Sequence, residues 1–144
     1  MACGYCNKNW TPLGGGGHYT RKNKACDDCY PLSRKAELLY HAALHRAKKE
    51  KLPFDLDHNF IVEKLRGVCP RTGRAFRLFG AGRNYKDRFP DTPSIDKIKA
   101  EKGYTKDNVQ IAAWWYNLSK ALYTDEEVLE YCRRVVSLAT TRTA

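Results

Sequence analysis

One stretch of the chain, residues 93–120, constrains the fold more than any other. It begins with an alternation of polar and apolar residues over positions 94–98, which predicts a half-buried strand. A polar segment with a central glycine then leaves room for a turn, and a second short strand is predicted at residues 108–111. From residue 112 onward, strong helix formers with apolar side chains at helical spacing predict a helix. The expected local order is therefore strand, loop, strand, helix.

Three polar side chains of this stretch could converge at one end of such a unit. Asp96 lies in the first predicted strand, Asn108 at the start of the second, and Asn117 in the helix. A carboxylate with amide oxygens suits Mg²⁺, Mn²⁺ or Ca²⁺ better than zinc. A small site of this kind can polarise a phosphodiester and stabilise its leaving group. From the spacing alone, a turn aspartate, a capping asparagine and a solvated helical asparagine explain the same residues.

The phrase PSIDKI…KGYTKDNVQI…W..N..K resembles the ββα-metal motif of HNH endonucleases. It is most similar to the phage-type variants, in which Asp and Asn replace the metal-binding histidines. The resemblance implies that Asp96 and Asn117 are ligands of a catalytic Mg²⁺ or Mn²⁺ ion. It also implies that Asn108 orients the base or holds the loop between the strands. Double-stranded DNA as the substrate, and a phage-encoded protein in the cytoplasm of the host cell, are further expectations from the resemblance.

One residue departs from the family pattern. The position after the metal-binding Asp is usually the general-base His, and here it is Lys97. An ordinary lysine, with a pKa near ~10.4, is a poor base at neutral pH. The site is therefore expected to use another base or a metal-bound water, or else to be inactive. Lys97 is counted among the catalytic residues as a contact to the phosphate or to the charge that develops on it.

Two CxxC pairs, Cys3 with Cys6 and Cys26 with Cys29, are separated by 19 residues. Four thiolates at this spacing suit a tetrahedral Zn²⁺ ion. The glycine run at residues 14–17 cannot build a core, so a metal ion is the simplest means of ordering the segment. A closed shell of four thiolates leaves no position for water or substrate, which predicts a structural site. Two disulfides are the alternative, which an intracellular setting disfavours.

The chain carries a formal net charge of +10, from 26 Lys and Arg against 16 Asp and Glu. Such an excess favours a polyanionic partner, because each phosphate contact releases counterions. A basic helix is predicted before residue 52, with Ser33 as its N-cap, and a basic glycine-containing loop lies at residues 80–88. A solvated helix face and a flexible polar loop are the alternatives. The residues predicted to contact nucleic acid are Arg46, Lys48, Lys49, Arg83, Lys86 and Arg88.

We expect a small α+β protein in three parts. Residues 1–32 form a four-cysteine zinc-binding module, residues 33–52 a basic linker helix, and residues 53–144 an HNH-like ββα-metal domain with a C-terminal helix. The final helix has an apolar face that is expected to pack on the metal unit. The chain has no run of ~18 apolar residues and no secretory h-region near its first residue. No contact with a membrane is therefore expected, and a cytoplasmic protein is the default.

The leading functional hypothesis is a metal-dependent DNA endonuclease or nickase. The alternative is a catalytically inactive, zinc-containing DNA-binding protein, which the absent base His supports. A weaker third possibility is a zinc-bearing adaptor for a host protein, which would show little affinity for DNA at ~150 mM salt. The sequence does not indicate the oligomeric state.

Overall fold

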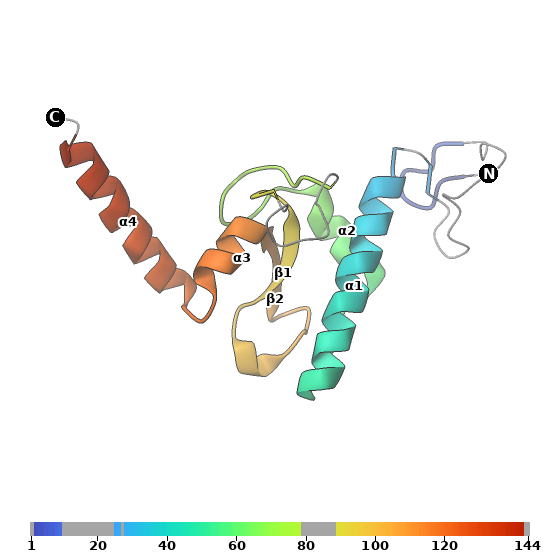
Figure 1. Ribbon diagram of the computed structural model, residues 1–144. Helices are drawn as coiled ribbons and strands as arrows, with labels where there is room; N and C mark the ends of the chain where they lie inside the picture. Colours follow the sequence, from blue (N-terminus) through green and yellow to red (C-terminus); the bar gives the residue numbers. More distant parts are fainter. Residues whose placement is uncertain (1, 10–24, 27, 79–88, 143–144) are drawn as a thin grey trace.

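The computed structural model describes residues 2–9, 25–26, 28–78 and 89–142. The fold is α+β, as predicted, with one small sheet among several helices (Figure 1). No helix in the described part of the chain is both long and apolar enough to span a membrane. The elements in order are α1 (Tyr30–Glu50), α2 (His58–Arg66), β1 (Pro93–Lys97), the 3₁₀ helix η2 (Ala100–Lys102), β2 (Val109–Ala113), α3 (Trp114–Lys120) and α4 (Asp125–Arg142).

Strands β1 and β2 form an antiparallel hairpin in which Ile95 lies opposite Ile111 and Asp96 opposite Gln110. Both strands begin within one residue of their predicted starts, and α3 follows β2 without a loop. Figure 1 shows the hairpin between the α1–α2 pair and α3. The two isoleucines pack with buried side chains of α1 and α2, which form the main core. The hairpin is thus held from the α1–α2 side by apolar contact.

The loop between the strands depends on Gly103. Its backbone has φ +77° and ψ −160°, a region that essentially only glycine adopts. A Cβ atom at this position would lie 2.5 Å from the carbonyl oxygen of Pro53. The close approach lets Tyr104 donate its backbone N–H to that same carbonyl, at 2.9 Å. The predicted turn glycine therefore also joins the hairpin loop to the segment that follows α1.

Helix α1 begins earlier than predicted, and Ser33 is not its N-cap. Cys29 occupies the N-cap position, and Pro31 lies in the first turn, where a missing N–H costs no helical hydrogen bond. The N–H of Ser33 already donates to the Cys29 carbonyl at 3.0 Å. The buried Ser33 hydroxyl instead pairs with the Tyr5 hydroxyl, at 3.0 Å. The cysteine segment therefore leads into the helix directly.

The expectation that α4 packs its apolar face on the hairpin is wrong for most of the helix. Val128 is the buried residue of α4, in a small second cluster with Tyr116 and Cys69. Beyond its first turn the helix projects away from the rest of the molecule (Figure 1), and its later apolar side chains are exposed. Ile95 and Ile111 of the hairpin have their apolar partners in α1 and α2, whereas Val128 packs with the two alanines at the end of β2.

Candidate functional site

Helix α3 lies along the edge of β1 that β2 does not pair. The Asn117 side chain donates from Nδ2 to the Ser94 hydroxyl at 2.9 Å and to the Ile95 carbonyl at 3.1 Å. The Lys120 ammonium donates to the Lys97 carbonyl at 3.1 Å. These bonds satisfy strand carbonyls that would otherwise be unpaired at an edge. The two side chains reach the strand together because residues three apart share one face of a helix.

Asp96 is buried and fully engaged within the protein. Its two carboxylate oxygens accept hydrogen bonds from the Lys120 ammonium, at 3.2 and 2.9 Å. Its Oδ2 also accepts from the Gln110 side-chain amide at 2.7 Å. Only 4% of the Lys120 side chain and 6% of the Asp96 side chain are exposed. Asp96 thus forms a buried ion pair, in which each charge depends on the other for compensation.

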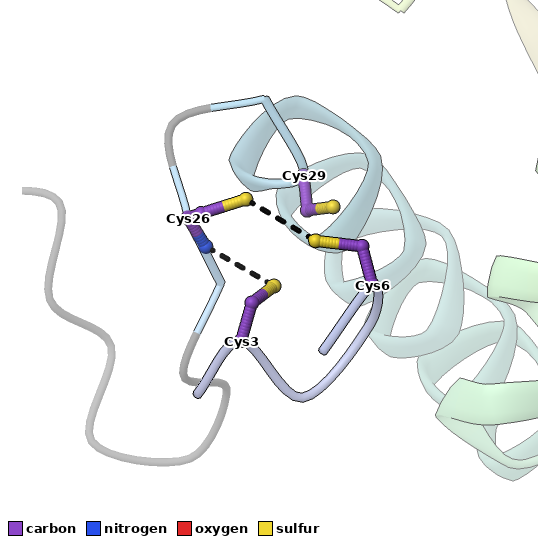
Figure 2. Close-up of side chains that lie close together, drawn as sticks. All are labelled: Cys3, Cys6, Cys26 and Cys29. Atoms are coloured by element: carbon purple, nitrogen blue, oxygen red, sulfur yellow. Dashed lines mark hydrogen bonds between the residues drawn. The ribbon is translucent and has the colours of Figure 1, made fainter. Parts of the chain in front are cut away.

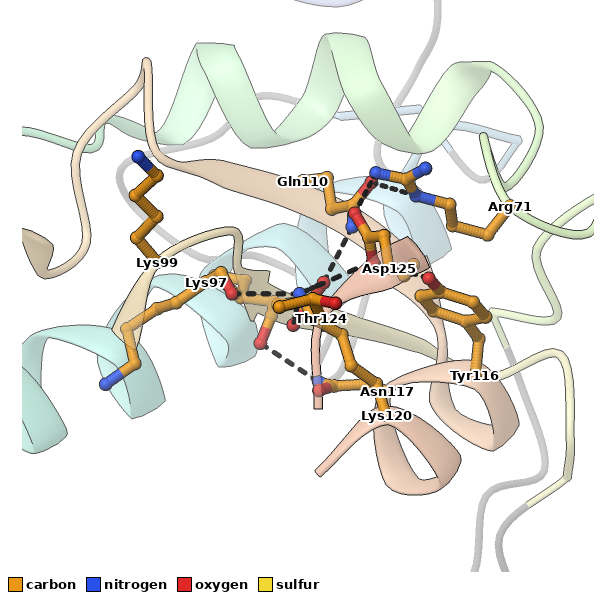
Figure 3. A network of polar contacts seen from close by, with 12 residues as sticks. Arg71, Lys97, Lys99, Gln110, Tyr116, Asn117, Lys120, Thr124 and Asp125 are labelled. Atoms are coloured by element: carbon orange, nitrogen blue, oxygen red, sulfur yellow. Dashed lines mark hydrogen bonds and ion pairs between the residues drawn. The ribbon is translucent and has the colours of Figure 1, made fainter. Parts of the chain in front are cut away.

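The ion pair belongs to a larger polar network, drawn in Figure 3. The Lys120 ammonium lies 3.5 Å from the Asp125 carboxylate at the start of α4, and Arg71 forms an ion pair with the same carboxylate. Arg71 also donates to the Gln110 side chain at 2.9 Å. Two cations and two carboxylates therefore balance each other. Such a cluster is satisfied without a further ion.

The network also changes the acidity of two of its members. Burial would raise the pKa of Asp125, but the hydrogen bond from the Tyr116 hydroxyl and the charges of Lys120 and Arg71 hold it below the ordinary value of 3.8. Burial and the neighbouring Asp125 carboxylate raise the pKa of the Tyr116 hydroxyl. Asp125 is thus an anion and Tyr116 a neutral donor at neutral pH.

The structure places Asp96, Asn117 and Lys97 along one groove, which runs between α1 and the β1–α3 edge. Asn108, the remaining predicted catalytic residue, does not line it. Its buried side chain closes the hairpin loop: it accepts from the Lys99 N–H at 3.0 Å and donates to the carbonyls of Lys99 and Gly103, both at 2.8 Å. Of its two expected actions, holding the loop is the one that these contacts perform.

Lys97 points to the opposite face of β1 from Asp96. Its ammonium lies 3.3 Å from the Glu50 carboxylate and 4.9 Å from the centre of the Tyr104 ring. The side chain is therefore held between α1 and the hairpin loop rather than beside the Asp96 carboxylate. A phosphate in the groove would compete with Glu50 for this ammonium.

The α1 wall of the groove is basic. Lys35 and Arg46 line it, and Arg46 donates to the Tyr104 hydroxyl at 3.0 Å, which fixes its guanidinium over the groove. Lys48 and Lys49 lie exposed in the last turn of the same helix. The predicted nucleic-acid contacts Arg83, Lys86 and Arg88 lie outside the described residues.

The Asp96 and Asn117 side chains offer the donor types that a hard divalent ion takes. Asn117 uses its Nδ2 on the strand, which leaves Oδ1 as the amide atom able to coordinate. The carboxylate of Asp96, however, is neutralised by Lys120. The donor set fits Mg²⁺ or Mn²⁺ only if the ion replaces the ammonium as the counter-charge.

A second candidate site lies at the start of the chain, where the Sγ atoms of Cys3, Cys6, Cys26 and Cys29 all lie within 4.8 Å of one another (Figure 2). The Cys6 and Cys26 sulfurs are 3.6 Å apart, far longer than a disulfide bond of ~2.05 Å. Tetrahedral coordination with bonds of ~2.3 Å separates the ligand sulfurs by ~3.8 Å. The cluster therefore has the dimensions to hold a metal ion such as zinc.

Hydrogen bonds already favour the thiolate form of Cys3, whereas burial raises the pKa of the Cys26 and Cys29 thiols. Burial would raise the pKa of the Cys3 thiol, but backbone N–H groups, that of Cys26 foremost, lower it from 9.0 to about 6. The Cys26 N–H donates to the Cys3 sulfur at 3.3 Å. Metal ligation requires the thiolate form, so this arrangement prepares the first ligand.

Sequence reasoning gave no function to four residues that surround Asp96: Arg71, Gln110, Lys120 and Asp125. Lys120 could have been suspected from its spacing, because it lies three residues after Asn117 on the same helix. Gln110 could have been found from strand register, since it lies opposite Asp96. Arg71 and Asp125 were not found because their ion pair joins segments 54 residues apart.

No family model matches this chain, and no curated protein is significantly similar to it in sequence. Among solved structures, the rare-cutting HNH restriction endonuclease PacI is similar, with a TM-score of 0.53 and 14% sequence identity. The match covers 99% of this chain and 98% of that one. The chain therefore shares its fold, over nearly its whole length, with an HNH restriction endonuclease.

Proposed function

We propose that this protein is a metal-dependent DNA endonuclease or nickase of the HNH type, which hydrolyses phosphodiester bonds. The observation that carries the proposal is the placement of Asp96 and Asn117 in one groove at the edge of β1. Both belong to a β-β-α unit in a chain whose fold is similar to that of an HNH restriction endonuclease. A phage origin rests on the sequence resemblance alone.

Asp96 and Asn117 would hold a Mg²⁺ or Mn²⁺ ion, which when bound polarises the scissile phosphate and stabilises the leaving 3′ oxygen. Lys120 keeps the buried Asp96 charge compensated in the metal-free chain. Its ammonium also donates to the Lys97 carbonyl, so it retains a partner when it gives up the carboxylate. Asn108 positions the strand ends through the loop, and in this way orients the attacking water or its base indirectly.

The DNA backbone would lie along the basic wall of α1. Arg46 and Lys35 face the groove there, and Lys48 and Lys49 extend the positive surface beyond it. Lys97 would exchange the Glu50 carboxylate for a phosphate oxygen. Arg83, Lys86 and Arg88, which lie outside the described residues, would add further phosphate contacts. Contacts of this kind give affinity that falls steeply with salt.

The four-cysteine cluster would hold a structural Zn²⁺ ion. Thiolates are soft ligands that select zinc over magnesium or calcium, and four of them leave no open position for catalysis. The cluster sits at the start of α1, whose other end carries the basic residues. Zinc would therefore stabilise the helix that presents the groove.

Incubation of zinc-loaded protein with supercoiled plasmid and MgCl₂ or MnCl₂ tests the proposal. We expect nicked or linear plasmid with either ion, and no product in EDTA. Asp96→Asn keeps the shape of the side chain but removes the anionic ligand, and should lower the rate by at least ~100-fold. Glu101→Gln is the matched control, because it removes an exposed carboxylate from the same hairpin outside the groove. It should cleave as fast as the wild type.

Two results would contradict the endonuclease proposal. Cleavage that is equally fast with Asp96→Asn would show that the metal site lies elsewhere. Plasmid binding in a gel-shift assay, without nicking in either metal ion, would instead support the inactive DNA-binding alternative. Circular dichroism of each variant separates these outcomes from loss of folding.

A further inference from the structure

Helix α4 presents an apolar surface that the rest of the described chain does not cover. It projects from the molecule beyond its first turn (Figure 1), and Val128 is its buried residue. Large apolar patches that remain in water usually mark an interaction site. The side chains of α4 that are apolar and at least half exposed are Leu129, Tyr131, Val135, Val136 and Leu138.

The spacing on α4 indicates that the missing partner is another helix. Val128, Tyr131, Val135 and Leu138 follow each other at intervals of three, four and three residues. This is the a/d spacing of helices that pack side by side. The first three residues of this stripe also line a shallow groove with Trp115, Ser119 and Tyr123, so the apolar surface continues onto α3.

The charges of α4 indicate which helix can pack against it. Its first turns carry the exposed Glu126, Glu127 and Glu130, whereas Arg133, Arg134 and Arg142 lie in its second half. Asp125 is already paired within the chain with Arg71 and Lys120. A second α4 in antiparallel orientation would place the acidic half of each copy beside the basic half of the other. A parallel pair would place like charges together. The helix is therefore complementary to itself in one orientation only.

The exposed area is also sufficient for a stable pair. A large side chain offers roughly 150–250 Å² when fully exposed, and the apolar residues of α4 with Trp115 and Tyr123 are about half exposed or more. Together they can bury on the order of 600 Å² per copy, or about 1,200 Å² in a symmetric pair. That is the lower bound of the range for specific protein–protein interfaces.

We propose that α4 of one chain packs antiparallel against α4 of a second copy, so that the protein is a two-fold symmetric homodimer. Each α4 fills the groove that the other forms with its own Trp115 and Tyr123. The interface is isologous, because the same stripe is used by both copies. It lies on the far side of α3 from the α1 wall of the candidate catalytic groove.

Sedimentation velocity of the full zinc-loaded chain between ~1 and ~100 μM tests the dimer. We expect a species of twice the chain mass, and at least a tenfold weaker association for Val135→Glu, since each pair would then bury two unpaired carboxylates. Val135 is two-thirds exposed in the single chain, so this variant should fold. Ser137→Glu is the matched control on the opposite face of α4, and should dimerise like the wild type.

A short bismaleimide cross-linker tests the orientation. Cys132 is exposed and lies at the middle of the stripe, so antiparallel helices bring the two copies of this thiol together. Moving the thiol to the helix end, in Cys132→Ser/Thr141→Cys, would separate the two copies by roughly 27 Å in an antiparallel pair but not in a parallel one. We therefore expect covalent dimer from the wild type and none from the double variant.

Three outcomes would overturn the proposal. A single-chain mass at 100 μM would show that the stripe has a different occupant. A dimer that Val135→Glu leaves intact would place the interface elsewhere. Efficient cross-linking of the Thr141→Cys variant would show parallel helices. Far-UV circular dichroism confirms in each case that α4 is still formed.

Discussion

Lys120 is the residue that would compete with a divalent ion for the Asp96 carboxylate. Its ammonium is buried against that carboxylate, so Lys120→Met should leave an uncompensated charge and cost about 3–5 kcal/mol of stability. A divalent ion can supply the missing counter-charge. We therefore expect MnCl₂ to raise the melting temperature of Lys120→Met by more than that of the wild type.

The matched control for this experiment is Asp96→Asn/Lys120→Met, which removes both charges of the pair and should not respond to MnCl₂. An equal response of the wild type and Lys120→Met in differential scanning calorimetry would show that the ammonium and the ion do not compete. This readout is independent of catalysis, so it tests the site even if no cleavage is seen.

Asp125 should make the stability of the chain depend on pH in the acid range. Its pKa is lower in the folded state than in the unfolded chain, so the unfolded chain takes up the proton first. Its contribution is then fully present above the unfolded value of about 3.8 and is lost as the pH falls through the lower folded value. The free energy of unfolding of the wild type, measured with urea, should fall from pH 5 to pH 3. Asp125→Asn should lower the free energy of unfolding at pH 7 by about 2–3 kcal/mol. The free energy of unfolding of this variant should also change less between pH 5 and pH 3 than that of the wild type.

The exposed neighbour Glu126 provides the control for this pH dependence. Glu126→Gln removes a carboxylate from the same helical turn without touching Lys120, Arg71 or Tyr116. It should keep the wild-type slope between pH 5 and pH 3. If Asp125→Asn also keeps that slope, another carboxylate governs the acid unfolding.

At the scale of single elements, the sequence predicted what is encoded locally. The alternation in 94–98 located β1, and the helical spacing after residue 112 located α3, because both signals arise from neighbours along the chain. The apolar stripe of α4 predicted a helix with a buried face, but the expected partner of that face, the metal unit, was wrong for most of the helix. Spacing shows that a face needs a partner, whereas the identity of the partner depends on contacts between distant segments.

The stability cost of a substitution in the hairpin loop can be predicted only from the structure. Gly103→Ala should destabilise the chain by at least ~2–3 kcal/mol, because it forces a strained backbone and a contact with the Pro53 carbonyl. Gly73 also has a positive φ, of +68°, but open space around it, so Gly73→Ala should cost only the strain, about 1 kcal/mol. Gly67→Ala meets neither problem and should be nearly neutral.

Thermal unfolding of the three glycine variants measures this order directly. Equal losses for Gly103→Ala and Gly73→Ala would show that the approach to Pro53 adds nothing beyond the backbone strain. A neutral Gly103→Ala would mean that the loop can move away from the segment after α1.

For the molecule as a whole, the candidate site was only partly predictable. The groups Asp96 and Asn117 were found in the sequence because they match a motif, and the structure places both on one groove. The ion pair between the Lys120 ammonium and the Asp96 carboxylate was not predicted from the sequence. These residues lie 24 positions apart and meet only when α3 lies along β1. The cysteine cluster was predicted fully, since two CxxC turns bring their ligands together almost independently of the rest of the fold.

Hydrogen bonds connect the cysteine cluster to α1 and α2, so loss of a bound metal ion should also loosen the ends of these helices. The Tyr5 carbonyl, between Cys3 and Cys6, accepts a hydrogen bond from Arg66 at the end of α2, and the Tyr5 hydroxyl meets Ser33 in α1. Removal of zinc would weaken both of these hydrogen bonds. We therefore expect Cys26→Ser to lose the bound zinc and to increase hydrogen exchange in the first turns of α1 and the last turn of α2.

Cys132→Ser is the matched control for zinc removal, because Cys132 is exposed and lies far from the cluster in the sequence. It should retain about one zinc ion per chain in a metal assay and show wild-type exchange in α1 and α2. Zinc retained at full stoichiometry by Cys26→Ser would contradict a four-thiolate site. Zinc lost without any change of exchange would show that the module folds separately from the groove. The coupled loss that we expect has a physical cause, because Cys29 is both a member of the cysteine cluster and the N-cap of α1, the helix that carries the basic wall.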